Sequence, residues 1–170
     1  SRRNCSKADE SVMGQQLIVA AHAKINLALD VLRKREDGYH EVAMVMQSVG
    51  LADRVGLCER PEGIRVSTDL AGLDCGPTNL AYRAAALLQE RFSVRRGAEI
   101  VLEKHIPLAA GLAGGSADAA AVLQGLNRLW DLRLPQDTLA ELGSLLGSDV
   151  PFCIKGGTML ATGRGEILAP

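Results

Sequence analysis

The chain has 170 residues, of which 47% are hydrophobic and 23% are charged, and its formal net charge is −1. This length allows one domain with a real core, and the near-neutral charge argues against a nucleic-acid surface as the main function. The sequence contains no apolar run of the roughly 20 residues that a membrane span needs. The N-terminus lacks a signal-peptide core and the four cysteines form no CxxC motif, so we expect free thiols and a cytoplasmic location.

Residues 1–14 are polar and without pattern, and we interpret them as a disordered or extraneous tail before one domain over residues 15–170. From residue 15 onward, short apolar runs are separated by Gly, Pro and Asp, which predicts a series of strands. The expected strands cover residues 17–20, 25–31, 42–49, 54–58 and 64–68.

Helical periodicity begins after these strands. Thr78 or Asn79 is expected to cap a first helix, and a strand over 99–106 leads to a second helix whose apolar stripe ends at Trp130. A third helix is expected over about 136–146, and residues 151–154 and 158–162 are expected to be extended. Because several strands precede the first helix, the predicted class is α+β rather than a doubly wound sheet.

Residues 107–117, here called the Gly-rich segment, carry the most informative local chemistry. Gly111, Gly114 and Gly115 lack a Cβ, so an anion can approach the backbone closely. Ser116 is expected to cap the following helix, whose first N–H groups and positive dipole end favour a phosphate. A tight strand-to-helix turn would explain the same pattern. No Gly-Lys-Ser/Thr follows, so a cation and a base for phosphoryl transfer must come from elsewhere.

Lys24 and Asp149 are the candidates for that cation and that base. Lys24 and Asn26 lie two residues apart on an apolar strand and so share a face, although a solvent-facing lysine is an alternative. Asp149 follows a predicted helix end and could equally be a turn residue bonded to its own backbone. We rank Asp118 below it, because the helix dipole already explains a carboxylate in the first turn of the second helix.

Five motifs occur together in one known family: Ala23-Lys-Ile-Asn-Leu27, Asp37-Gly-Tyr-His-Glu41, the Gly-rich segment, Gly147-Ser-Asp-Val-Pro-Phe152 and Gly156-Gly-Thr158. In this order they resemble the 4-diphosphocytidyl-2-C-methyl-D-erythritol kinases of the galactokinase, homoserine, mevalonate and phosphomevalonate (GHMP) kinase superfamily. The resemblance implies the fold of the GHMP-kinase N-terminal domain, similar to the second domain of ribosomal protein S5. It also implies that the family's C-terminal domain is missing from this chain.

The resemblance implies ATP-dependent phosphorylation of the 2-hydroxyl of 4-diphosphocytidyl-2-C-methyl-D-erythritol, on the non-mevalonate route to isoprenoid precursors. Lys24 and Asp149 match the family's catalytic lysine and aspartate, with Asp149 accepting the hydroxyl proton. Asn26, Tyr39 and His40 match its substrate-binding positions. Magnesium is expected as counter-charge, with ligands that the sequence does not identify. The ATP phosphates would lie against Pro107, Leu108, Ala109, Ala110, Gly111, Leu112, Ala113, Gly114, Gly115, Ser116 and Ala117.

Three alternatives are left open. The chain could be a truncated, non-catalytic fragment that binds nucleotide. It could be another GHMP small-molecule kinase, although the sister kinases generally lack the Asp37-Gly-Tyr-His40 element. It could also be an S5-like RNA-binding module, which would need a basic face and would bind RNA in a salt-sensitive way. The expected partner is a small-molecule substrate rather than a nucleic acid or a membrane.

Overall fold

The computed structural model describes residues 16–34, 38, 40–163, 165 and 167–170. The expected N-terminal tail and Tyr39 lie outside the described residues.

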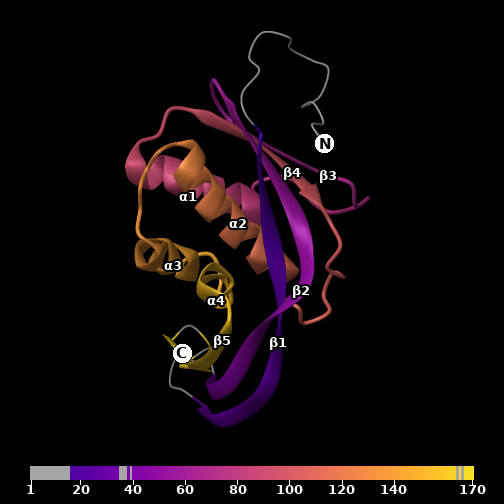
Figure 1. Cartoon of the computed structure of the whole chain (residues 1–170), viewed down its shortest axis with the longest axis vertical. Coiled ribbons are helices and arrows are strands. Elements are labelled where there is room, and N and C mark those ends of the chain that lie inside the picture. The colour runs from indigo at the N-terminus through magenta and orange to yellow at the C-terminus, as the bar shows by residue number, and fades with distance from the viewer. Residues whose placement is uncertain (1–15, 35–37, 39, 164, 166) are drawn as a thin grey trace.

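Two long antiparallel strands, β1 (Leu17–Lys34) and β2 (His40–Arg60), form the centre of the fold (Figure 1). The prediction of four shorter strands in this region is wrong. Pairing between β1 and β2 continues on both sides of Gly50, a residue typical of turns, at Ser48 and at Ala52. The irregular positions are taken up as register shifts between the two strands, one of them where residues 49–51 of β2 lie opposite Ala23 of β1.

Four further strands complete a six-stranded sheet in the order β3-β4-β2-β5-β6, with β1 paired to β2 outside this path. They are β3 (Ile64–Thr68), β4 (Gly97–Glu103), β5 (Thr158–Thr162) and β6 (Ile167–Ala169). β3 and β4 are parallel, and the other pairs are antiparallel. β4 pairs with residues 54–60 of β2 and β5 with residues 44–47, so β2 links the two ends of the sheet.

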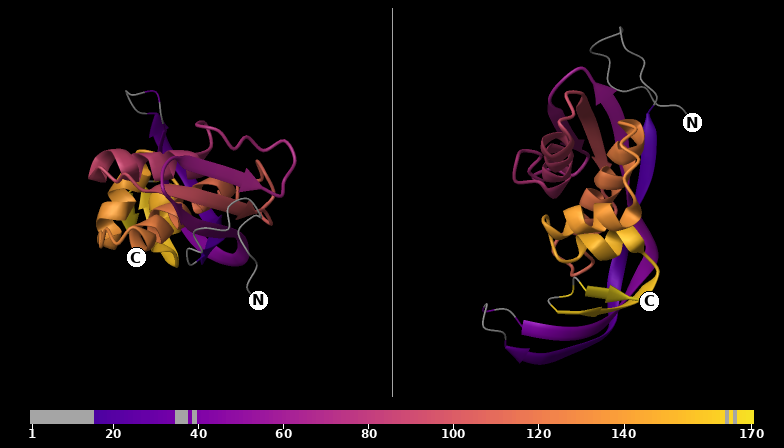
Figure 2. Two further views of the ribbon diagram at one scale, coloured as in Figure 1. Left: turned by 90° about the horizontal axis from the view of Figure 1, so that it is seen from above. Right: turned by 90° about the vertical axis from the view of Figure 1, so that its left-hand side faces the viewer.

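The helices are α1 (Leu80–Phe92), α2 (Gly114–Leu129), α3 (Gln136–Ser144) and α4 (Val150–Lys155), and they gather on one face of the sheet (Figures 1 and 2). Asn79 caps α1 as predicted, its side chain accepting the N–H of Ala81 at 2.8 Å. The expected extended segment over 151–154 is wrong, because these residues form α4. Pro151 occupies the first turn, where its fixed φ suits a helix and its missing N–H costs nothing.

The main core lies between the sheet and the four helices and consists mostly of Ala, Leu, Val and Ile, together with Trp130. A second, smaller cluster of Met44, Met46, Phe152 and Ala161 lies where α4 meets the sheet. This sheet with helices on one face confirms the α+β class. In the part of the chain that the structure describes, none of the helices has the length and hydropathy to cross a membrane.

Candidate active site

Lys24 lies in β1 directly after the register shift that follows His22, opposite a bulge formed by residues 49–51 of β2. Its backbone N–H donates to the carbonyl of Leu112 at 3.1 Å, which ties β1 to the Gly-rich segment. The side chain is buried, with the whole residue only 5% exposed, so the solvent-facing alternative is wrong. Its Nζ donates to Asn26 Oδ1 at 3.1 Å, which confirms that Lys24 and Asn26 share a face.

Asp149 immediately precedes α4 and faces Lys24. Its Oδ2 lies 3.6 Å from Lys24 Nζ, and its side chain is 32% exposed whereas that of Lys24 is 7% exposed. The carboxylate makes no capping hydrogen bond to α4, so the turn-residue alternative does not describe its role. The structure therefore pairs a buried ammonium with a carboxylate that solvent, or a ligand, can reach.

The Gly-rich segment divides into a loop over residues 107–113, here called the Gly-rich loop, and the first turn of α2. The expected Ser116 cap is wrong. Ala113 occupies the cap position with a left-handed backbone (φ 58°), so α2 begins at Gly114 and Ser116 is its third residue. Alanine at the cap position has no acceptor in its side chain, so among the described residues the first-turn N–H groups of α2 have no capping acceptor.

The N-terminus of α2 lies close to the segment that carries Asp149. A Cβ placed on Gly147 would lie 3.8 Å from Ser116 Oγ, which puts the first turn of α2 beside the residues leading to Asp149. The hydrogen bond from the Lys24 N–H to the Leu112 carbonyl joins β1 to the loop residue two positions before α2, so Lys24 is also close to this helix start. Free amide groups at a helix start, a lysine and an accessible carboxylate therefore meet at one place, an arrangement suited to binding an anion and taking up a proton.

His40 is not part of this group. It is the first residue of β2, is exposed, and pairs with Lys34, whereas Lys24 pairs with Ser48. Eight residues of strand separate Ser48 from His40, which corresponds to about 26 Å along β2. The expected substrate contacts of Tyr39 and His40 therefore stay a prediction.

A buried cluster of charges under the Gly-rich loop was missed by the sequence analysis. Lys104 Nζ forms ion pairs with Asp53 and, at 2.5 Å, with Asp118 Oδ2; the three side chains are 3%, 0% and 4% exposed. The placement of Asp118 in the first turn of the helix is wrong, since α2 has no acidic residue there. Asp53 lies inside β2 and Lys104 directly follows β4, but each stands next to another charged residue, Arg54 and Glu103, so the sequence offers no clear signal for the cluster.

Burial raises the pKa of Asp118 to about 7; the neighbouring Asp53 carboxylate acts in the same direction, and Lys104 opposes both. The Oδ1 atom of Asp118 is buried and has no hydrogen-bond partner among the described residues. The cluster holds two carboxylates against one ammonium, so one of the three charges is uncompensated when both carboxylates are ionised.

Ionisation of the buried Asp118 carboxyl is expected to lower the free energy of unfolding as pH rises. Because its folded-state pKa of about 7 lies above the unfolded value of 3.8, the folded protein binds the extra proton between these values. The contribution of Asp118 to the free energy of unfolding is therefore fully present below about pH 4 and is lost as pH rises through about 7. We expect the stability of Asp118→Asn relative to the original chain to increase from about pH 5 to about pH 8, as measured by urea unfolding. A difference that does not change with pH would contradict the assignment.

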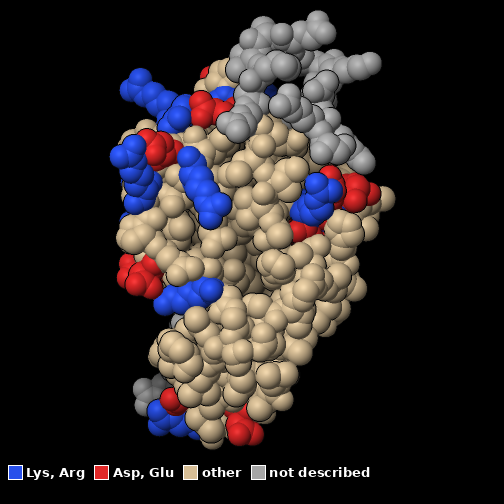
Figure 3. Space-filling model, in the orientation of Figure 1, with Lys and Arg blue, Asp and Glu red and all other residues tan. Residues whose placement is uncertain are grey.

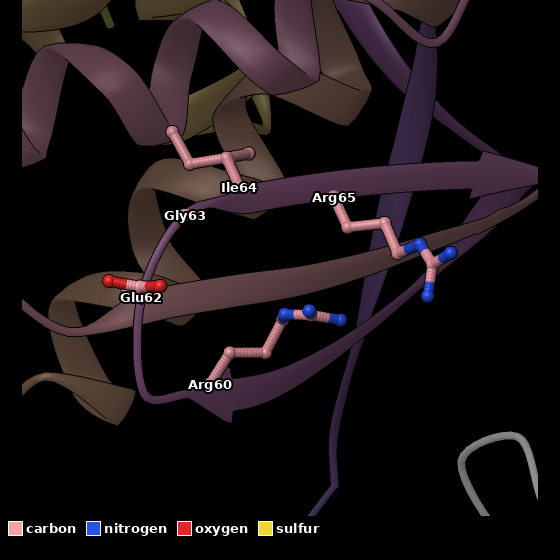
Figure 4. A pocket seen from close by; sticks show the side chains of 5 residues that line it. All are labelled: Arg60, Glu62, Gly63, Ile64 and Arg65. Carbon is pink, nitrogen blue, oxygen red and sulfur yellow. The ribbon is translucent and has the colours of Figure 1, made fainter. Parts of the chain in front are cut away.

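Other surface features lie away from this site. A pocket at the turn between β2 and β3 is lined by Arg60, Glu62, Gly63, Ile64 and Arg65 (Figure 4). In the view of Figure 3, Lys and Arg alternate with Asp and Glu over the upper half, and the lower half is largely uncharged. This face shows no continuous basic stripe of the kind that the RNA-binding alternative requires.

Cys153, one turn after Asp149, is a free thiol as predicted. Burial raises its pKa to about 12, with the nearby Asp149 carboxylate adding to the effect. It is therefore a neutral packing residue rather than a nucleophile.

Comparison with known proteins bears on the fold of this chain. Residues 79–157 match the GHMP kinases N terminal domain, and the chain has the fold of that domain. It is 59% identical over 157 residues to the 4-diphosphocytidyl-2-C-methyl-D-erythritol kinase of Geobacillus kaustophilus, covering 91% of this chain and 54% of that protein. The chain spans about half the length of the curated relatives that it matches.

Two solved structures superpose on nearly the whole chain. A crystal structure of 4-(cytidine 5'-diphospho)-2C-methyl-D-erythritol kinase superposes with a TM-score of 0.80 at 42% identity, covering 91% of this chain and 55% of that one. The mevalonate kinase of Methanococcus jannaschii superposes with a TM-score of 0.70 at 14% identity, over 93% of this chain and 56% of that one. The second likeness shows the shared fold alone.

Proposed function

We propose that this chain supplies the nucleotide-binding and catalytic residues of an ATP-dependent kinase acting on the 2-hydroxyl of 4-diphosphocytidyl-2-C-methyl-D-erythritol. The observation that carries the proposal is the Lys24–Asp149 pair, 3.6 Å apart, beside the uncapped N-terminus of α2. The high identity to relatives that bear this name supports the choice of acceptor. The reaction belongs to the non-mevalonate route to isoprenoid precursors.

The Gly-rich segment would hold the ATP phosphates. The amide groups at the start of α2 point out of the helix end, and the helix dipole adds about half a positive charge there. Residues 107–111 are exposed, so a triphosphate can reach the loop backbone without displacing the core. The hydroxyl of Ser116, in the same turn, is a further donor.

Asp149 would act as the base. As the acceptor hydroxyl oxygen forms its bond to the γ-phosphorus, Asp149 takes the hydroxyl proton, and the bond from phosphorus to the bridging oxygen breaks with its electron pair leaving on ADP. Lys24 holds the carboxylate in place through their ion pair, and Asn26 fixes the ammonium by accepting its hydrogen bond.

Magnesium is typical of such kinases and would add positive charge at the phosphates. Among the described residues, no group of three or more His, Cys, Asp or Glu side chains could hold a metal ion. The arrangement does not fit a magnesium ion held by protein ligands alone, and no step above depends on one.

The far end of the acceptor carries a cytosine. We propose that Tyr39 and His40 bind this base, because they match the substrate-binding positions of the kinases that the sequence resembles. We also place Asn26 beside the acceptor, because it shares the face of Lys24.

Phosphate transfer from ATP labelled in the γ position tests this function directly. We expect labelled product from 4-diphosphocytidyl-2-C-methyl-D-erythritol, and at least about a hundredfold less from mevalonate or homoserine under the same conditions. Transfer to one of those acceptors instead would favour another GHMP kinase. ATP binding without transfer to any of them would favour the nucleotide-binding fragment, and salt-sensitive RNA binding without ATP binding would favour the S5-like module.

A further inference from the structure

The short connection between β4 and the Gly-rich loop is anchored by carboxylates. The N–H of Lys104 donates to Asp69 Oδ1 at 2.9 Å. The N–H groups of His105 and Ile106 donate to Asp53 Oδ1 at 2.5 and 2.8 Å. These residues directly follow β4, so side chains take over from the sheet as acceptors. The stem of the loop is thereby fixed to β2 and to the end of β3.

Lys104 connects this stem to helix α2. Its Nζ contacts Asp53, and it lies 2.5 Å from Oδ2 of Asp118 in α2. A Cβ placed on Gly114 would lie 3.6 Å from the same Nζ, so the ammonium is close to the first residue of the helix. The side chain of Lys104 therefore connects the segment before the Gly-rich loop with the helix that follows the loop.

We propose that Lys104 and Asp118 form a clamp that fixes the Gly-rich loop relative to the N-terminus of α2 and thereby sets the affinity for the triphosphate of ATP. Both are positioning residues, since they are buried beneath the loop and act through its backbone. The consequence for ATP rests on the proposed function, whereas the ordering of the loop does not.

The clamp matters because the loop has little support of its own. Residues 107–111 are exposed, and Ala109 and Ala113 both adopt left-handed backbone conformations that disfavour alanine. Such strain persists only where the surrounding structure holds the chain in place. The Lys104–Asp118 pair provides this hold on one side and the Leu112–Lys24 hydrogen bond on the other.

The pair of variants Asp118→Leu and Asp118→Asn isolates the clamp. Leucine has a size similar to asparagine but cannot accept a hydrogen bond from Lys104, whereas asparagine can. Both variants leave Lys104 paired with Asp53 and remove the uncompensated charge, so neither strands a buried ion. For Asp118→Leu we expect the dissociation constant of ATP to rise about tenfold or more, and for Asp118→Asn it should stay within about twofold of the original chain. The exposed Arg54–Glu103 pair, which also links β2 to β4, supplies Arg54→Gln as a control with unchanged affinity.

Amide hydrogen exchange of residues 108–115, measured without any ligand, provides a readout that does not depend on the proposed function. We expect these amide groups to exchange about tenfold faster in Asp118→Leu than in Asp118→Asn. Equal exchange in the two variants, with both folded by circular dichroism, would overturn the clamp. Should Asp118→Leu fail to fold, Asp118→Ala takes its place in the same comparison.

The two measurements separate the possible failures. If the original chain binds no ATP, the proposed function fails while exchange still decides whether the clamp exists. If exchange rises in Asp118→Leu but ATP affinity does not fall, the clamp's role in nucleotide affinity is overturned. If both variants lose ATP affinity equally, the charge of Asp118 rather than its link to Lys104 is responsible, which also overturns the proposal.

Discussion

We expect the replacement of Asp149 with asparagine to remove most of the proposed kinase turnover and to leave nucleotide binding intact. Asparagine keeps the size of the side chain but cannot accept the hydroxyl proton. Loss of a positioned base typically costs about 10²- to 10⁴-fold in rate. Nucleotide binding should persist, because the amide groups at the start of α2 do not depend on the carboxylate. The measurement is kcat with the cytidylyl acceptor, together with the dissociation constant of ATP.

Asp137→Asn is a matched control for this prediction. Asp137 lies in the first turn of α3, its side chain is 84% exposed, and it pairs with Lys155 at 3.0 Å. An exposed pair of this kind contributes at most about 1 kcal/mol, so both turnover and binding should stay unchanged. Unchanged turnover in Asp149→Asn would refute its assignment as the base, and parallel loss of ATP binding would show that Asp149 serves the nucleotide instead.

Replacing Trp130 with alanine is expected to cost about 3–5 kcal/mol of the free energy of unfolding. Trp130 directly follows α2, is only 1% exposed and belongs to the main core. Its removal leaves a large cavity where the helix end meets the core. The total free energy of unfolding of a native protein is roughly 5–15 kcal/mol, so this loss should lower the midpoint of urea unfolding markedly.

Circular dichroism is the appropriate probe, because Trp130 is the sole tryptophan in the sequence. The hydrogen bond from Arg96 to the carbonyl of residue 130 involves the backbone and should survive the substitution. Phe92→Ala is the control, since Phe92 ends α1 and is 37% exposed; we expect a clearly smaller loss there. Equal losses in the two variants would contradict the placement of Trp130 in the core.

Local patterns predicted those features that depend on neighbouring residues. Asn79 caps α1 because its side chain reaches an N–H two residues along the chain. Lys24 and Asn26 share a face because side chains alternate along a strand. The Gly-rich segment does join a strand to a helix, as predicted. The cap residue is Ala113 rather than Ser116, because Ala113 adopts a left-handed backbone conformation that alanine by itself disfavours.

Local patterns failed where distant partners decide the outcome. Short runs along β1 and β2 merged into two long strands because each strand supplies the other's hydrogen bonds. The segment after Asp149 became α4 because its apolar residues pack on α2 and α3 rather than in a sheet. Asp53, Lys104 and Asp118 carry no motif, and their significance comes only from being buried together.

The sequence by itself determined the α+β class and the likeness to the GHMP kinases N terminal domain, because motifs and side-chain types can be read from neighbouring residues. Only the tertiary structure decided that Lys24 and Asp149 meet 3.6 Å apart, that Lys24 is buried, and that Lys104 forms a buried ion pair with Asp118. The physical reason is that distance, burial and charge pairing depend on packing between segments far apart in the chain. A local pattern records which groups are present, and the fold brings them together.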